Sequence, residues 1–386
     1  MYKSTAEAER TAQLINECKE EFYCNDPSAI PTLHRADHVE YLLSALENGL
    51  SKDYISLDSS HPWICFWICQ SLHLLGAELN SKQKQKIFNT LSQCKCPNGG
   101  FSGSPAVQFP HLASTYAAVA TIALLAEPAF YSLLLDEDSK EELAAFLLSL
   151  KQPDGSWSMH EDGESDARAV YCALATAYLC ALPLEELGCE KTVSFLASCQ
   201  NWDGGIGPQP GVESHGGYSY CAYASLCLLN QTKAVDELRL VQWAVARQDR
   251  ELGGFQGRTG KLVDGCYSFW LGGLFELLAK WGGFCLSAEP EGRADNLLFD
   301  QYALQEFLLV CCQCAPGSGG MLDKPDTFAD LYHTCYDLAG LAAAQSSQKF
   351  VLGEVGNLVG KSNALLNVNE QLVQQQRAFL SRQNKP

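Results

Sequence analysis

The sequence predicts an all-α fold, specifically an α-α toroid in which about six helical hairpins close into a barrel. The first reason is a glycine-rich turn followed by an aromatic-rich apolar run, which recurs at intervals of fifty-odd residues. The second is that the segments between these runs carry apolar residues at helical spacing, as residues 37–50 do. The third is that strand-like alternation is nearly absent. Periodicity alone leaves an open helical solenoid as the alternative.

The repeats follow one another along most of the chain. The turns lie at residues 98–101, 153–157, 202–206, 252–255 and 318–321. The helical runs that follow them span residues 115–125, 167–179, 218–229, 265–278 and 332–344, and an earlier run at 62–75 lacks its turn. We expect these apolar runs to form the inner ring of the toroid, and the amphipathic segments between them to form the outer ring.

The repeats predict one catalytic domain over residues 35–347, because no linker rich in proline, serine or charge interrupts them. Residues 1–34 are expected to be an N-terminal helical extension. Residues 348–386 are expected to be a C-terminal loop and closing helix. The glycine and asparagine content of residues 353–369 indicates a surface loop, and residues 370–383 indicate the helix.

The composition excludes several classes of partner. The chain has 27 Lys and Arg against 45 Asp and Glu, a formal charge of -18, and such a surface repels nucleic-acid phosphates and anionic lipid headgroups. No stretch approaches the roughly 20 apolar residues of a membrane span, and the N-terminus lacks the apolar run of a secretory signal. We therefore expect a cytoplasmic protein whose 18 cysteines are mostly reduced core thiols.

Polar groups at the start of two of the apolar runs suggest a metal site. Asp264 and Cys266 stand two residues apart where a helix is expected to begin, so non-helical dihedrals can let both converge. His333 occupies the equivalent place in a later repeat. A carboxylate, a thiolate and an imidazole leave the fourth position of a tetrahedral zinc ion open, as in catalytic sites. The alternatives are a helix cap, a core thiol and an internal histidine.

A second polar group suggests an anion site. His215, Arg258, Lys261 and Tyr267 lie near glycine-flanked helix starts in an otherwise acidic chain. Cations and a phenol collected in this way suit a phosphate or diphosphate. Ordinary surface salt bridges are the alternative.

Taken together, these motifs resemble the β subunits of protein prenyltransferases, most closely those that transfer farnesyl groups. The resemblance covers roughly residues 35–347. It rests on residues 62–63, 109–113, 171–172, 199–202, 215–218, 261–270, 322–325 and 332–336. It implies a toroid of prenyltransferase-type repeats that forms a heterodimer with a helical-repeat α subunit. It further implies transfer from farnesyl diphosphate, through a zinc-bound thiolate, to the cysteine of a C-terminal C-a-a-X motif in proteins such as small GTPases.

The resemblance also assigns roles to individual residues. Asp264, Cys266 and His333 are implied to be the zinc ligands, one Zn²⁺ per chain, and Asp323 to help hold Mg²⁺. The diphosphate is implied to contact His215, Arg258, Lys261 and Tyr267. The isoprenoid is implied to lie against Arg168, Tyr171, Tyr218, Cys221 and Trp270, and to meet the peptide near Trp63, Trp67, Tyr332 and Tyr336.

Three rival functions are weighed against the farnesyl interpretation. Type I geranylgeranyl transfer is disfavoured because Trp63 and Tyr336 are bulky and because Asp323 stands where that branch carries a lysine. A terpene cyclase is disfavoured because the chain lacks an Asp-x-Asp-Asp motif. A non-catalytic helical scaffold would have no reason to assemble the three zinc ligands.

Overall fold

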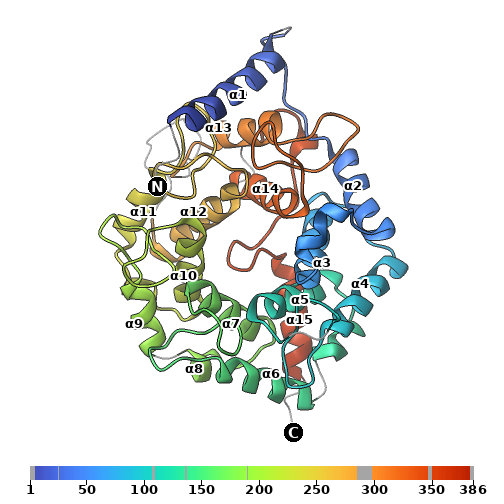
Figure 1. The fold of residues 1–386 in the computed structure, drawn as a ribbon, viewed down its shortest axis with the longest axis vertical. Coiled ribbons are helices and arrows are strands. Elements are labelled where there is room, and N and C mark those ends of the chain that lie inside the picture. The colour runs from blue at the N-terminus through green and yellow to red at the C-terminus, as the bar shows by residue number, and fades with distance from the viewer. Residues whose placement is uncertain are drawn as a thin grey trace.

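The computed structural model describes residues 5–24, 26–106, 109–134, 137–188, 190–284, 298–346 and 350–382. Within these ranges the apolar runs are the inner helices of a ring. These are α3 (His61–Leu74), α5 (Leu112–Leu125), α7 (Ala167–Leu179), α10 (Gly216–Leu228), α12 (Tyr267–Gly282) and α14 (Leu331–Ala344). Each packs against the next, and α14 packs against α3 (Figure 1). The ring is therefore closed, which confirms the predicted toroid and excludes the open solenoid.

Amphipathic helices surround this ring. They are α2 (Arg35–Asn48), α4 (Ser81–Cys94), α6 (Glu137–Ser149), α8 (Leu184–Leu187), α9 (Glu190–Ser198), α11 (Glu237–Val245) and α13 (Gln301–Glu306), which continues as a π-helical turn at Phe307–Cys311. In α4, for example, Ile87, Leu91 and Cys94 are buried while the other residues are half-buried or exposed. One apolar stripe is enough for an outer helix, because it covers the inner ring on one side only.

The recurring turns owe their glycines to space as well as to backbone conformation. Gly204 has φ +96°, and a Cβ there would lie 2.3 Å from the carbonyl oxygen of Arg239. Gly155 has φ +94° and would meet the backbone of Lys191 at the same separation. No L side chain fits both conditions. The turns form isolated antiparallel β-bridges, such as that between Gln200 and Ile206. Within the described residues these bridges do not extend into strands.

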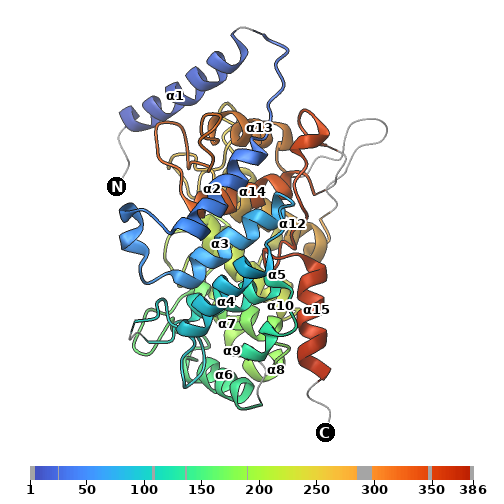
Figure 2. The ribbon, with the colours of Figure 1, turned by 90° about the vertical axis from the view of Figure 1, so that its right-hand side faces the viewer.

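Two further helices lie outside the ring. Helix α1 (Thr5–Tyr23) rests on the π-helical turn, and α15 (Glu370–Arg382) packs along α5 and α7 (Figure 2).

The limits of the catalytic domain, residues 35–347, stay a prediction. No helix in the described part of the chain combines the length and the apolar character that a bilayer crossing requires.

The expectation of a surface loop over residues 353–369 is wrong for its last third. Leu366 and Val368 are fully buried, because the chain here packs against the inner helices α5 and α7. The hydroxyl of Tyr116 donates to the carbonyl oxygen of Leu366 at 2.6 Å, and that of Tyr171 donates to Leu365 at 2.9 Å. The buried tyrosines of the ring need acceptors, and this segment supplies them from its backbone.

Candidate active site

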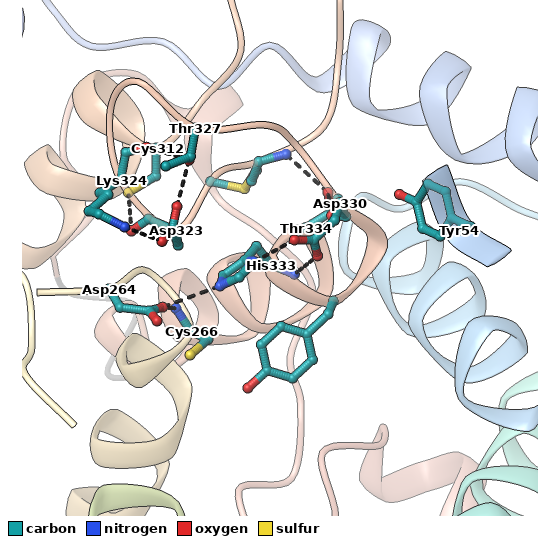
Figure 3. A network of polar contacts seen from close by, with 12 residues as sticks. Tyr54, Asp264, Cys266, Cys312, Asp323, Lys324, Thr327, Asp330, His333 and Thr334 are labelled. Atoms are coloured by element: carbon teal, nitrogen blue, oxygen red, sulfur yellow. Dashed lines mark hydrogen bonds and ion pairs between the residues drawn. The ribbon is translucent and has the colours of Figure 1, made fainter. Parts of the chain in front are cut away.

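The three expected metal ligands lie together where α12 and α14 begin. Asp264 and Cys266 precede α12, and the backbone N–H of Cys266 donates to the Asp264 carboxylate at 2.9 Å. His333 lies in the first turn of α14, the neighbouring inner helix. One ligand atom from each residue lies within 4.8 Å of the others (Figure 3). The closed ring thus brings the start of one repeat against the start of the next.

Asp330, which the sequence analysis did not single out, orients the imidazole of His333. As the N-cap of α14 it accepts the backbone N–H of His333 at 2.8 Å. Its other oxygen lies 2.7 Å from Nδ1 of the same residue. Because Nδ1 donates to this carboxylate, Nε2 is turned toward Asp264, whose Oδ1 lies 3.3 Å away. Carboxylates commonly hold metal-ligating histidines in this way.

The electrostatics of this group fit a cation. Burial lowers the pKa of His333, but its hydrogen bonds to Asp264 and Asp330 outweigh burial and raise it well above the usual range. Burial and the nearby Asp264 charge raise the pKa of the Cys266 thiol. The carboxylates of Asp264 and Asp330 thus favour a positive charge at the position of His333. A carboxylate, a thiol and an imidazole are also the donor set of zinc sites.

His215 and Tyr267 form a hydrogen-bonded pair beside the metal ligands. Nδ1 of His215 accepts the N–H of Gly217 at 3.1 Å, as the N-cap of α10. Burial and the Arg258 charge lower the pKa of His215 to about 4, so the ring is neutral and carries its proton on Nε2. That nitrogen lies 3.0 Å from the Tyr267 oxygen and donates to it. The Tyr267 hydroxyl proton is consequently left to point at a ligand.

The remaining expected diphosphate residues lie in the turn before α12. Arg258 pairs with Glu213 at 2.9 Å, and Gly216 donates its N–H to the carbonyl oxygen of Gly257 at 2.8 Å. Lys261 follows in the same turn, and its N–H donates to the Arg258 carbonyl oxygen at 3.3 Å. The start of α10 and the approach to α12 therefore form one continuous polar face.

Asp323 lies against this face but is already engaged by its neighbours. Its backbone carbonyl accepts the N–H of Gly265 at 2.7 Å. Its carboxylate pairs with the ammonium group of Lys324 and accepts the hydroxyl of Thr327 at 2.5 Å (Figure 3). Lys324 is a further cation, beside Arg258 and Lys261, that the sequence analysis did not single out, because adjacent residues of opposite charge are common on exposed loops. Here the pair is joined to the segment from Asp264 to Cys266 by the hydrogen bond between Gly265 and the Asp323 carbonyl oxygen.

An aromatic cavity of about 310 Å³ lies inside the ring. Eight expected residues line it: Trp63, Trp67, Arg168, Tyr171, Cys221, Trp270, Tyr332 and Tyr336. Tyr218 lies outside the lining, with its ring 5.3 Å from that of His215. Tyr116, Met159, Cys172, Tyr220 and Phe269 also line the cavity and were missed. Met159 lies in the irregular segment between α6 and α7. The other four belong to inner helices that the sequence makes apolar on every side, so the direction of their side chains could not be assigned.

The aromatic cavity and the metal ligands are connected through Tyr332. Its hydroxyl accepts the indole N–H of Trp270 at 3.1 Å and lies beside the Cys266 thiol. A second cavity of about 480 Å³ shares Trp63 and Ala113 with the aromatic one. It is more polar, with His111 and His160 in its lining. The two cavities therefore adjoin at Trp63 and Ala113.

Comparison with known proteins agrees with this architecture. A family model described as the prenyltransferase alpha-alpha toroid domain matches residues 33–373. The protein farnesyltransferase subunit beta of Schizosaccharomyces pombe is 39% identical over 306 residues, which cover 79% of this chain and 77% of that protein. The Saccharomyces cerevisiae subunit of the same name is 40% identical over 330 residues, covering 85% of this chain and 72% of that protein.

A solved structure shares the fold. The geranylgeranyltransferase-I of Candida albicans, complexed with GGPP, superposes with a TM-score of 0.70 at 22% identity, over 92% of this chain and 100% of that one. At this identity the likeness concerns the fold alone. The extent of the sequence matches goes further, because they span most of both partners at well above 30% identity. The chain belongs to the prenyltransferase α-α toroid family and, within it, to the β subunits of protein farnesyltransferases.

Proposed function

We propose that this chain is the catalytic β subunit of an enzyme that transfers a farnesyl group from farnesyl diphosphate to the cysteine thiol of a C-terminal C-a-a-X motif. The observation that carries the proposal is the convergence of Asp264, Cys266 and His333 beside the aromatic cavity. Thioether formation needs a thiolate nucleophile next to a bound lipid diphosphate, and this is the place where the two can meet.

Asp264, Cys266 and His333 would hold one zinc ion. When bound, zinc lowers the pKa of a coordinated thiol, so that the substrate cysteine attacks as a thiolate. The residues of the chain prepare this arrangement. Asp330 fixes the Nε2 of His333 toward Asp264, and burial excludes water from Cys266, which is 4% exposed.

The leaving diphosphate gains negative charge as the carbon–oxygen bond breaks. Tyr267 has its hydroxyl proton free to donate, because His215 already donates to its oxygen. Arg258 and Lys261 add positive charge from the same face. Donors fixed in place before the reaction stabilise developing charge more than they stabilise the ground state.

We further propose that Asp323 contributes to a Mg²⁺ site at the diphosphate. Its carboxylate is paired with Lys324, so a cation would have to compete with an ammonium group already in place. The requirement for magnesium then depends on how readily this pair opens. We propose farnesyl rather than a longer chain as the lipid, because the bulky side chains of Trp63 and Tyr336 line the cavity.

The proposed partner is a prenyltransferase α subunit, since the relatives at 39% and 40% identity are each named as the β subunit of such an enzyme. Large apolar side chains on the surface are consistent with an assembly. Phe328 is 94% exposed and Ile55 is 79% exposed. Burial of such apolar side chains by a partner protein removes them from water and stabilises the complex. Location in the cytoplasm, where C-a-a-X proteins are made, stays part of this proposal.

The test is a prenyl-transfer assay with the chain co-expressed with its α subunit. Farnesyl and geranylgeranyl diphosphate are offered in parallel to peptides that end in C-a-a-X. We expect farnesyl transfer to dominate, and we expect Cys266→Ala to abolish transfer from both donors. Preference for the geranylgeranyl donor would favour type I geranylgeranyl transfer instead. No transfer from either donor would refute the proposal.

A further inference from the structure

A buried carboxyl group close to the metal ligands takes no part in the chemistry described above. Asp337 lies on α14 one helical turn after His333, and its exposed fraction is 0%. Among the residues that the structure describes, neither of its carboxyl oxygens has a hydrogen-bond partner. A buried polar group without a partner destabilises a fold. We therefore expect Asp337 to have a functional role that offsets this cost.

The carboxyl group of Asp337 packs directly on Gly265, the residue between Asp264 and Cys266. A Cβ placed on Gly265 would lie 2.4 Å from Oδ2, 2.5 Å from Oδ1 and 2.7 Å from Cγ of Asp337. Gly265 does not have a positive φ, so its backbone would accept alanine. Glycine is required here by space alone, because the carboxyl group of α14 fills the position that a side chain would take.

The same contact joins the two helices that carry the ligands. Three residues further along each helix, a Cβ on Gly340 of α14 would lie 2.3 Å from the Cβ of Ser268 on α12. The segment that carries Asp264 and Cys266 is therefore in close contact with α14 at the Asp337 carboxyl group and again three residues further on. Such interfaces transmit small displacements, because they have no free volume in which to absorb them.

We propose that Asp337 is a positioning residue that holds the segment from Asp264 to Cys266 against α14. Its carboxyl group sets the separation between the ligands of α12 and His333. The proposal rests on the zinc site proposed above. Shape carries the effect rather than charge, because neither carboxyl oxygen has a hydrogen-bond partner among the described residues and the group fills the space beside Gly265.

Three single variants of the co-expressed enzyme test the contact by zinc competition with a chromophoric chelator. Asp337→Ala removes the support of Gly265. Zinc should therefore bind about 10–100-fold more weakly, as is typical when a residue that orients metal ligands is removed. Asp337→Asn has nearly the same shape and should stay within about threefold of the wild type. Ser268→Ala is the matched control. It removes a buried hydroxyl from the same helix contact and should leave zinc affinity unchanged.

A double variant tests whether the contact itself is responsible. Gly265→Ala alone places a methyl group on the carboxyl of Asp337 and should also weaken zinc binding. In Gly265→Ala with Asp337→Ala, the methyl group occupies space that the carboxyl vacated. The double variant should therefore bind zinc more tightly than either single variant, an interaction that independent sites do not show.

The spectrum of the cobalt-substituted protein separates positioning from general stability. Thiolate-to-cobalt absorption should shift in Asp337→Ala and remain unchanged in Asp337→Asn. If Asp337→Ala lowers the melting temperature but leaves zinc affinity and the cobalt spectrum unchanged, the residue is only structural and the proposal fails. It also fails if Asp337→Asn behaves like Asp337→Ala, because charge would then carry the effect. A wild-type protein that binds no zinc would instead refute the zinc site.

Discussion

Replacing Asp330 by serine should separate two tasks of this carboxylate at the start of α14. One oxygen accepts the backbone N–H of His333 as a helix cap, and the other holds the imidazole Nδ1 at 2.7 Å. Serine caps a helix about as well as aspartate, but its hydroxyl does not extend to the ring. Asp330→Ser should therefore keep most of the stability and lose the orientation of His333.

The magnitude follows from the contact that is lost. A hydrogen bond to a charged group contributes about 1.5–3 kcal/mol, and about 1.4 kcal/mol corresponds to a factor of ten. Zinc affinity in Asp330→Ser should therefore fall about 10–100-fold. Asp330→Ala should show the same loss of affinity, with about 1 kcal/mol less stability because the cap is also gone.

The assay combines zinc competition with a chelator and thermal unfolding of both variants. In Asp330→Ser, zinc affinity should fall while the melting temperature stays close to that of the wild type. In Asp330→Ala, zinc affinity and melting temperature should both fall. If Asp330→Ser binds zinc as tightly as the wild type, Asp330 does not orient His333 and the interpretation of this contact is wrong.

Three further predictions concern the diphosphate side. Tyr267→Phe should lower single-turnover transfer by about 10²–10³-fold with little change in lipid affinity, since it removes a donor to the leaving group; an unchanged rate would contradict this role. Asp323→Ala should raise the magnesium requirement and leave zinc content intact, while Asp323→Lys should make turnover largely independent of magnesium; wild-type turnover that is indifferent to magnesium would refute the proposed site. His215 has a pKa of about 4 in the folded chain, below its usual value near 6.5, so its contribution to stability is complete above about pH 6.5 and is lost as the pH falls toward 4. His215→Gln should flatten this part of the stability profile measured by denaturant unfolding, and an identical slope would contradict the assignment.

The sequence predicted the succession of helical repeats well because each repeat begins with a recognisable glycine-rich turn. Turns such as the one at Gly204 require glycine for steric reasons, and an apolar helix follows each of them. The division between inner and outer helices follows from the difference between apolar and amphipathic runs. Ring closure itself needed the structure, since the contact of α14 with α3 joins segments that are far apart along the chain.

The candidate site was predictable only where unusual residues stand at helix starts. Asp264, Cys266 and His333 are chemically distinctive there, and the structure brings them together. Asp330 was missed because an aspartate before a helix already has an ordinary explanation as a cap. Asp337 was missed because nothing in the local sequence shows that its carboxyl group would be buried against another repeat.

The tail shows the same limit more clearly. Glycine and asparagine in residues 353–369 favour a loop, and the chain there is indeed irregular. Burial of Leu366 depends on hydroxyl donors from helices more than a hundred residues earlier, such as that of Tyr116. Local composition predicts conformation but carries no information on such distant partners.

Metal content measured on the purified, co-expressed enzyme tests the central claim most directly. The wild type should contain one zinc per β chain, held by Asp264, Cys266 and His333. Cys266→Ala should lose both the zinc and farnesyl transfer, while circular dichroism shows unchanged helical content. Full zinc occupancy in Cys266→Ala would contradict the account, because the thiol would then not be a ligand and the site beside the aromatic cavity would not be the metal centre.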